Sequence, residues 1–174
     1  YLAVQLIELG VPLVIAFNMS DVAEARGLKF DLDQLSRFLG APIVPTVANR
    51  GKGIDELVDK VLEVARGECD YAPPPLHYGR ELDAQIQAIE KRLVDRPEQV
   101  VDERPRWTAL KLLENDMEVR ERVRDEEVRQ AVDRSIAHIR HVIGDPPEIA
   151  IADRRYGFIS GACTETVKST VEAR

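Results

Sequence analysis

Two short polar segments, each after an apolar run, carry the residues with the most specific chemistry. The first is Asn18-Met19-Ser20-Asp21, which follows the run 11–17. The Asp21 carboxylate has two acceptor oxygens and guanine has two neighbouring donors, the ring N1–H and the exocyclic amino group, so they could form a charge-assisted two-point contact. The Asn18 amide can donate and accept at once. The segment therefore fits recognition of a guanine base, whereas its commonest role would be a capping Asp and a turn Asn.

The second segment, Thr46-Val47-Ala48 with the loop 49–53, follows the apolar run 41–45. We expect both runs to form strands that are buried on both faces, because unbroken apolar runs rich in β-branched residues are typical of parallel sheets. Ligands of such sheets bind beyond the carboxyl ends of the strands. The two polar segments are therefore expected to meet at one edge of a sheet.

Helical patterns flank both strands. Helices are predicted over 2–9, 31–39 and 54–65. The second has the capping-box spacing of Asp31 and Gln34, and the third has a predicted inward face of Ile54, Leu57, Val61 and Ala65. The order helix, strand, helix, strand, helix is that of the back half of a doubly wound α/β domain. Two strands cannot complete such a sheet, so we expect further apolar surface that another segment or another chain covers.

Together the two motifs resemble the fourth and fifth motifs of the Ras-like GTPases. Asn18-Met19-Ser20-Asp21, with Met where most such GTPases carry Lys, and the segment 44–51 are similar to ferrous iron transport protein B. The resemblance implies GTP or GDP as the ligand. It implies base contacts from six residues: Asn18, Met19, Asp21, Thr46, Val47 and Ala48. It also places the Ala48 N–H opposite the guanine O6 and the Met19 stem over one face of the base.

The composition changes after residue 67. The segment 67–75 ends in three consecutive prolines, which favour an extended, stiff spacer. Beyond it, apolar residues recur at helical spacing in three long segments, and a bundle of about four to five helices fits them. Their predicted inward faces are Leu82, Ile86, Ile89 and Leu93, then Val128, Val132, Ser135, Ile136, Ile139 and Ile143, then Ile149, Ala152, Tyr156, Ile159 and Cys163.

The resemblance extends over this second half, because 106–114 and 151–159 are similar to recurring phrases of the helical domain in the same family. It implies the C-terminal part of a GTPase domain over 1–67, a linker over 68–76 and a helical domain over 77–174. The fold class predicted is thus α/β plus all-α, the back half of a Ras-like P-loop GTPase domain followed by a small helical bundle. In that family the helical domain modulates nucleotide release. It also links the GTPase to a transmembrane iron-permease domain, so the implied location is the cytoplasmic face of the bacterial inner membrane.

The composition limits the kinds of partner and compartment that suit this chain. The net charge of −7 argues against a nucleic-acid partner, which would require a basic face. Two distant cysteines indicate a reducing compartment without a disulfide framework. The sequence has no apolar run of about 18 residues, the length typical of a transmembrane helix.

No segment matches Gly-x-x-x-x-Gly-Lys-Ser/Thr, the loop that holds phosphates and Mg²⁺ in GTPases. We therefore expect the first part of the GTPase domain to be missing from these residues and to be a partner in the intact parent, which would bind Mg²⁺. This chain alone is expected to make only base contacts and to lack GTPase activity. Its incomplete sheet would be covered by that missing half or by self-association.

Two other functions fit parts of the sequence. One is a Ras-like GTPase that acts on ribosomes or RNA, which the acidic balance and the helical appendage disfavour. The other is a non-enzymatic interaction module, a helical bundle with a degenerate α/β cap.

Overall fold

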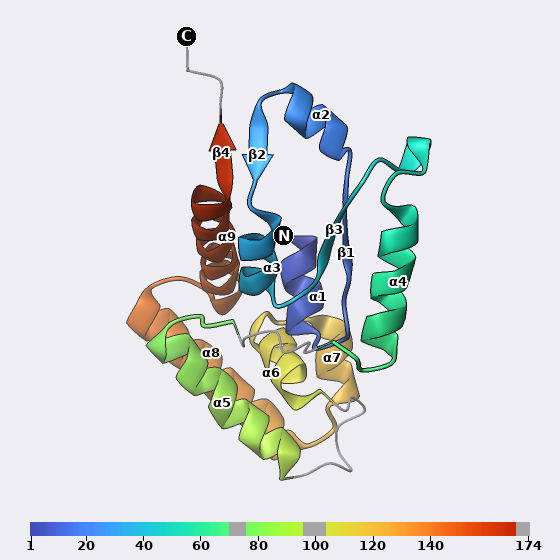
Figure 1. Ribbon diagram of the computed structural model, residues 1–174. Coiled ribbons are helices and arrows are strands. Elements are labelled where there is room, and N and C mark those ends of the chain that lie inside the picture. The colour runs from blue at the N-terminus through green and yellow to red at the C-terminus, as the bar shows by residue number, and fades with distance from the viewer. Residues whose placement is uncertain (70–75, 96–103, 170–174) are drawn as a thin grey trace. The chain divides into compact units, whose positions relative to one another are not determined.

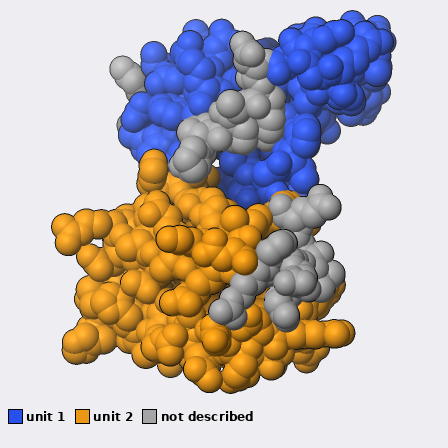
Figure 2. Space-filling model, turned by 90° about the horizontal axis from the view of Figure 1, so that it is seen from below, with its two compact units in different colours: residues 1–75, 158–174 blue, residues 76–157 orange. Residues whose placement is uncertain are grey.

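The computed structural model describes residues 1–69, 76–95 and 104–169 (Figure 1). The chain divides into two compact units, shown in different colours in Figure 2: residues 1–75 with 158–174, and residues 76–157. The longest helix, α9 (Pro147–Thr166), contributes residues to both. Most of the predicted linker, 68–76, lies outside the described residues.

The first unit is built around a pair of parallel strands, β1 (Ile15–Asn18) and β3 (Ile43–Thr46), in register from Ile15 opposite Ile43 to Asn18 opposite Thr46. The predicted helices are present as α1 (Leu2–Glu8), α3 (Leu32–Leu39) and α4 (Ile54–Ala65). The Asp31 side chain caps α3 by accepting the Gln34 N–H at 2.9 Å. The sequence order of helices and parallel strands is therefore as predicted.

The predicted burial of this unit is wrong in two places. Strand β1 is not buried on both faces, because Ala16 is exposed and Phe17 only half-buried. Helix α4 was expected to bury Val61, yet that side chain is 46% exposed and no residue of α4 is fully buried. The reason is that the described sheet has only two strands here, so one side of it and of α4 has no neighbour in unit 1.

A second sheet in the same unit was not predicted. The short helix α2 (Ser20–Ala25) leads into β2 (Leu28–Phe30), which pairs antiparallel with β4 (Val167–Ser169) from the far end of the chain. The sequence predicted only helices in the last part of the chain, and the strand β4 corrects that prediction. Strands of three residues are too short to show an alternating pattern, and these two come from segments far apart in the chain.

The second unit is a helical bundle. It contains α5 (Arg80–Val94), α6 (Pro105–Leu113), α7 (Met117–Arg122), α8 (Glu126–Ile143) and the first part of α9. Pro105 opens α6 in the first helical turn, where its fixed φ suits the helix and its missing N–H leaves no bond unmade. The predicted inward faces of α5 and α8 are confirmed, since they supply much of one continuous core: Leu82, Ile86, Ile89, Leu93, Val128, Val132 and Ile139.

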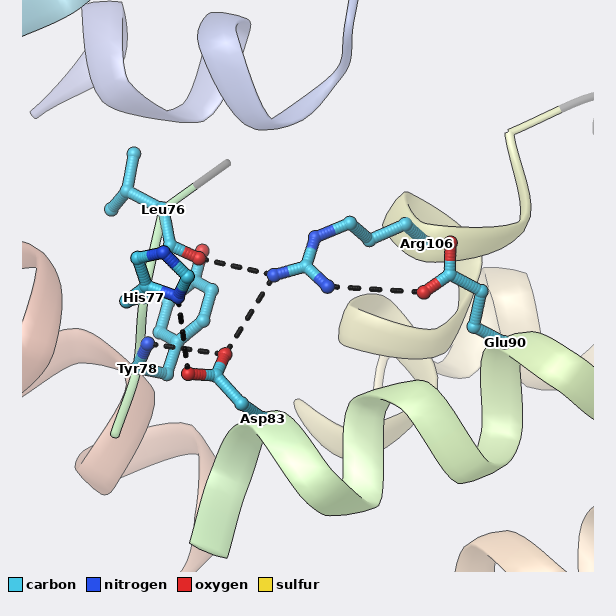
Figure 3. Close-up of polar contacts among 6 residues, drawn as sticks. All are labelled: Leu76, His77, Tyr78, Asp83, Glu90 and Arg106. Carbon is cyan, nitrogen blue, oxygen red and sulfur yellow. Dashed lines mark hydrogen bonds and ion pairs between the residues drawn. The ribbon is translucent and has the colours of Figure 1, made fainter. Parts of the chain in front are cut away.

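A polar cluster fixes the chain where it enters this bundle (Figure 3). The Asp83 carboxylate of α5 accepts the Tyr78 N–H at 3.2 Å. The guanidinium of Arg106, on α6, donates to the Leu76 carbonyl at 3.0 Å and lies 3.7 Å from Asp83 and 3.8 Å from Glu90. One arginine thus links α6 to two turns of α5 and to the segment ahead of it.

Helix α9 buries a different face from the one predicted. Ile149 and Tyr156, expected inside, are 49% and 61% exposed, whereas Ile151 is fully buried and Arg155 is 1% exposed. The Arg155 guanidinium donates to the Glu114 carboxylate at the end of α6. In the described ranges, α9 included, no helix combines the length and the apolar character that crossing a bilayer requires.

Candidate functional site

The two sequence motifs meet at the carboxyl end of the parallel pair. Figure 1 shows β1 and β3 side by side, and their last residues, Asn18 and Thr46, are register partners. The chain then leaves β1 into α2 and leaves β3 into the 3₁₀ helix η1 (Ala48–Arg50). All six predicted site residues therefore lie at one edge of this sheet, where parallel α/β proteins bind ligands.

The Asn18 side chain ties the two loops together. Its Oδ1 accepts the Ala48 N–H at 3.1 Å and the Thr46 hydroxyl at 3.4 Å. Asn18 is exposed, and an amide side chain carries two N–H donors besides this acceptor oxygen. Asn18 thus braces the second loop through contacts between residues far apart in the chain.

Met19 and Asp21 occupy the turn after β1. Met19 has a left-handed backbone, with φ of 61°, and its side chain is 60% exposed. Asp21 lies in the first turn of α2, and its Oδ1 accepts the Val22 N–H at 2.9 Å. The other oxygen, Oδ2, lies 3.5 Å from the guanidinium of Arg50. Both carboxylate oxygens of Asp21 therefore have a partner within the chain.

Buried side chains and a backbone hydrogen bond hold the second loop in place. Thr46 and Val47 are buried, at 1% and 3% exposure, and the Val47 N–H donates to the Lys52 carbonyl at 3.0 Å. Gly53 closes the loop at a φ of 77°, where a Cβ atom would overlap the Pro45 carbonyl oxygen. Only glycine fits this position without strain.

Two residues of the site were not predicted. The Ser20 hydroxyl donates to the Thr46 carbonyl at 3.2 Å and so forms a second link between the loops. The Arg50 guanidinium forms an ion pair with the Asp21 carboxylate at 3.5 Å. A hydroxyl inside the first motif was a usable signal for Ser20, but the partner of an exposed loop arginine cannot be read from spacing.

Metal ligands are absent from this edge as far as it is described. Within 1–69, 76–95 and 104–169, no three His, Cys, Asp or Glu side chains are grouped so that they could hold a metal ion. The site as it stands consists of amide, hydroxyl and carboxylate groups with backbone N–H donors. Such groups suit the hydrogen-bonding edge of a planar base.

Two family models match the chain. The one described as Ferrous iron transport protein B matches residues 1–61, and the one described as FeoB cytosolic helical domain matches residues 78–168. Among curated proteins, the Fe(2+) transporter FeoB of Escherichia coli K12 is 34% identical over 173 residues, which is 99% of this chain and 21% of the relative. A fusion of Fe(2+) transport protein A and FeoB from Porphyromonas gingivalis is 35% identical over 177 residues. The chain thus spans about a fifth of the length of these relatives (21%).

Solved structures agree with these matches. A GDP-bound NFeoB variant from S. thermophilus superposes with a TM-score of 0.86 at 31% identity, covering 97% of this chain and 63% of that one. The mGMPPNP-bound NFeoB from the same organism gives a TM-score of 0.84 at 30% identity, covering 100% and 64%. These similarities confirm the predicted fold class, part of a Ras-like GTPase domain followed by a helical domain.

Proposed function

Because the chain belongs to the ferrous iron transport protein B family, we propose that it is the guanine-reading part of a cytosolic GTP-binding region, with its helical domain, in a membrane transporter of ferrous iron. The observation that carries this proposal is the pair of Asn18 contacts, which hold Thr46 and Ala48 against the end of β1. Relatives named as Fe(2+) transporters and neighbours solved with GDP or mGMPPNP support it.

Guanine recognition would centre on Asp21. Its two carboxylate oxygens would accept the N1–H and the exocyclic amino group, and the Arg50 guanidinium, now 3.5 Å away, would have to yield one of them. The exposed Met19 side chain would cover one face of the base. The Ala48 N–H would turn from Asn18 toward the guanine O6 as the base enters.

A base-swap experiment tests this assignment in a longer protein that carries these residues together with a phosphate-binding loop. Asp21→Asn replaces a charged acceptor with an amide, so GDP affinity should fall by about 10- to 150-fold, the equivalent of one lost charged hydrogen bond of roughly 1.5–3 kcal/mol. Xanthosine diphosphate, which has a carbonyl in place of the amino group, should gain affinity. Dissociation constants for the guanine, xanthine and adenine diphosphates give the answer.

Asp33→Asn is the matched control. Asp33 lies in the first turn of α3 just as Asp21 lies in the first turn of α2, and it is exposed and belongs to neither motif. The control variant should retain wild-type affinity for GDP. If Asp21→Asn leaves the preference for guanine intact, or if the unmodified protein binds ADP as well as GDP, Asp21 does not read the base.

The residues present do not fit a Mg²⁺ or triphosphate site. The sequence lacks a Gly-x-x-x-x-Gly-Lys-Ser/Thr loop, which in GTPases supplies the phosphate cradle and the hydroxyl for the metal. Base contacts alone offer two or three hydrogen bonds of roughly 0.5–3 kcal/mol each, against an association cost of at least about 4 kcal/mol. This chain by itself should therefore hydrolyse no GTP and bind GDP at best at millimolar concentration. Calorimetric titration that finds micromolar binding would contradict this.

The remaining assignments follow from the family. The predicted division into 1–67, a linker over 68–76 and a helical domain over 77–174 is kept as a proposal, which the separate family matches support. The exposed apolar residues of α4, Val58, Val61 and Leu62, would contact the rest of the GTPase domain in the parent, or another copy when that part is absent. In the parent, this region would lie at the cytoplasmic face of the bacterial inner membrane and would be joined to a transmembrane iron-permease domain. Family membership disfavours the alternative of a GTPase that acts on ribosomes.

A further inference from the structure

The helical unit contains a groove that the nucleotide site does not use. It lies between α5 and α8 and has a volume of about 390 Å³. Each helix lines it with four residues at the positions i, i+3, i+4 and i+7, so the groove follows one face of each helix. Its volume is within the range of roughly 300–1,000 Å³ typical of small-molecule sites.

The charge of this groove is opposite to that of the whole chain. The protein has a net charge of −7, yet the groove is lined by Arg92 and Arg134 and by no carboxylate. In the part of the chain that the structure describes, neither guanidinium has an ion pair or a hydrogen bond, whereas most other arginines of the bundle do. His138 lines one end, where its Nε2 lies 3.7 Å from the Glu81 carboxylate. Two exposed arginines, Arg92 and Arg134, thus line the groove, and no carboxylate lines it with them.

The other lining groups suit an oxyanion. Gln85 can donate from its amide, and Ser135, a buried residue of α8, can donate from its hydroxyl. Ala88 and Ala131 leave room for a ligand to approach both helices. The planar guanidinium presents a fork of donors that matches the oxygens of phosphate, which is why arginine is the common residue at phosphate sites.

Two other hollows lined by described residues differ in kind. One, in the first unit, is lined by Lys29 and Lys168 but also by Asp31 and Asp33, so its charges are balanced. The second, around Phe17 in the same unit, is mainly apolar. Of these three hollows, the α5–α8 groove alone is lined by cationic side chains without a carboxylate.

From these observations we propose that the α5–α8 groove binds a phosphate group, held by Arg92 and Arg134 with Gln85 and Ser135 as neutral donors. The ligand class is a phosphate or phosphate monoester in solution or the phosphodiester headgroup of an anionic lipid. This proposal is independent of the guanine site, because no residue of that site takes part in it.

The experiment uses this 174-residue chain. Titration calorimetry at low ionic strength with inorganic phosphate and with pyrophosphate measures binding of the free anion. Flotation with phosphatidylglycerol vesicles, compared with phosphatidylcholine vesicles, measures binding of the headgroup. We expect saturable binding in at least one arm, and a loss of at least about tenfold in affinity for the double variant R92Q/R134Q, since each guanidinium supplies a charge-assisted contact.

R124Q/R140Q is the matched control, because it removes the same charge from two exposed arginines of the same unit that do not line the groove. It should bind like the unmodified chain, and circular dichroism should show both double variants folded. Binding of free phosphate identifies a soluble ligand, and binding to anionic vesicles alone identifies a headgroup. Failure of every arm, or equal losses in the two double variants, overturns the proposal.

Discussion

The buried ion pair between Arg155 and Glu114 gives the sharpest prediction of stability. The Arg155 side chain is 1% exposed and the Glu114 side chain 13%, and the second Glu114 oxygen lies 3.0 Å from the Lys111 ammonium. Glu114→Ala removes the carboxylate that faces a cation inside the bundle. Breaking a buried pair in this way costs about 3–5 kcal/mol, a large part of the total of roughly 5–15 kcal/mol that stabilises a domain.

Urea unfolding of the whole chain measures this cost. Trp107, the single tryptophan, lies in α6 of the same unit, so its fluorescence reports on the bundle itself. With a slope of roughly 1–3 kcal/mol/M, a loss of about 3 kcal/mol lowers the midpoint by about 1–3 M. Replacing both partners, as in Glu114→Leu with Arg155→Leu, should recover most of the loss because no buried charge then remains.

The pair of Glu118 with Arg122 on α7 provides the control. It joins the same residue types, but the side chains are 76% and 52% exposed. Glu118→Ala should therefore cost no more than about 1 kcal/mol, as is usual for surface ion pairs. If Glu114→Ala and Glu118→Ala shift the midpoint equally, burial does not set the strength of the Arg155 pair and the reasoning fails.

Two further predictions concern the first unit. Gly53→Ala should lower the free energy of opening of β3, measured by amide hydrogen exchange, by at least about 2 kcal/mol, because it adds overlap with the strand to the cost of a positive φ. Gly10→Ala, with a φ of 72° and no atom near its Cβ, should cost only the backbone term of about 1 kcal/mol, and an equal loss at both positions would argue against the overlap. Burial raises the pKa of the Cys69 thiol, and the Glu63 carboxylate, which accepts a hydrogen bond from it, raises the pKa further, so at pH 8 iodoacetamide should alkylate Cys69 more slowly than the exposed Cys163. Glu63→Gln should speed the reaction at Cys69. Mass spectrometry of the alkylated peptides measures the rate, and an unchanged rate at Cys69 would contradict the role of Glu63.

Periodicity predicted the fold best where one helix face meets one core. The inward faces of α5 and α8 follow from spacing because both helices pack within a single unit. The face of α9 could not be obtained in this way, because its buried Arg155 is polar in sequence and is brought inside only by the Glu114 partner. The predicted burial of α4 was wrong for the opposite reason. Val61 belongs to an apolar face that no described neighbour covers.

The candidate site could be located from sequence but not completed. The carboxyl ends of adjacent parallel strands must meet, so the apolar runs before Asn18 and Thr46 were sufficient to bring the two motifs together. The contacts of Ser20 and Arg50 depend on the shape of the loops after those strands, including the left-handed turn at Met19. Loop shape depends on long-range contacts that local spacing does not encode.

The β2–β4 sheet has a consequence for the order of folding. Its pairs, from Leu28 opposite Ser169 to Phe30 opposite Val167, join residues separated by almost the whole chain. Contacts of high sequence separation form late, because closing a long loop costs entropy before the contact is made. During synthesis β2 leaves the ribosome long before β4 is made. The hydrogen-bonding groups with which β2 later pairs to β4 therefore stay unpaired while the helical bundle is synthesised. The bundle should therefore fold first, and docking of β4 should be among the last steps of folding.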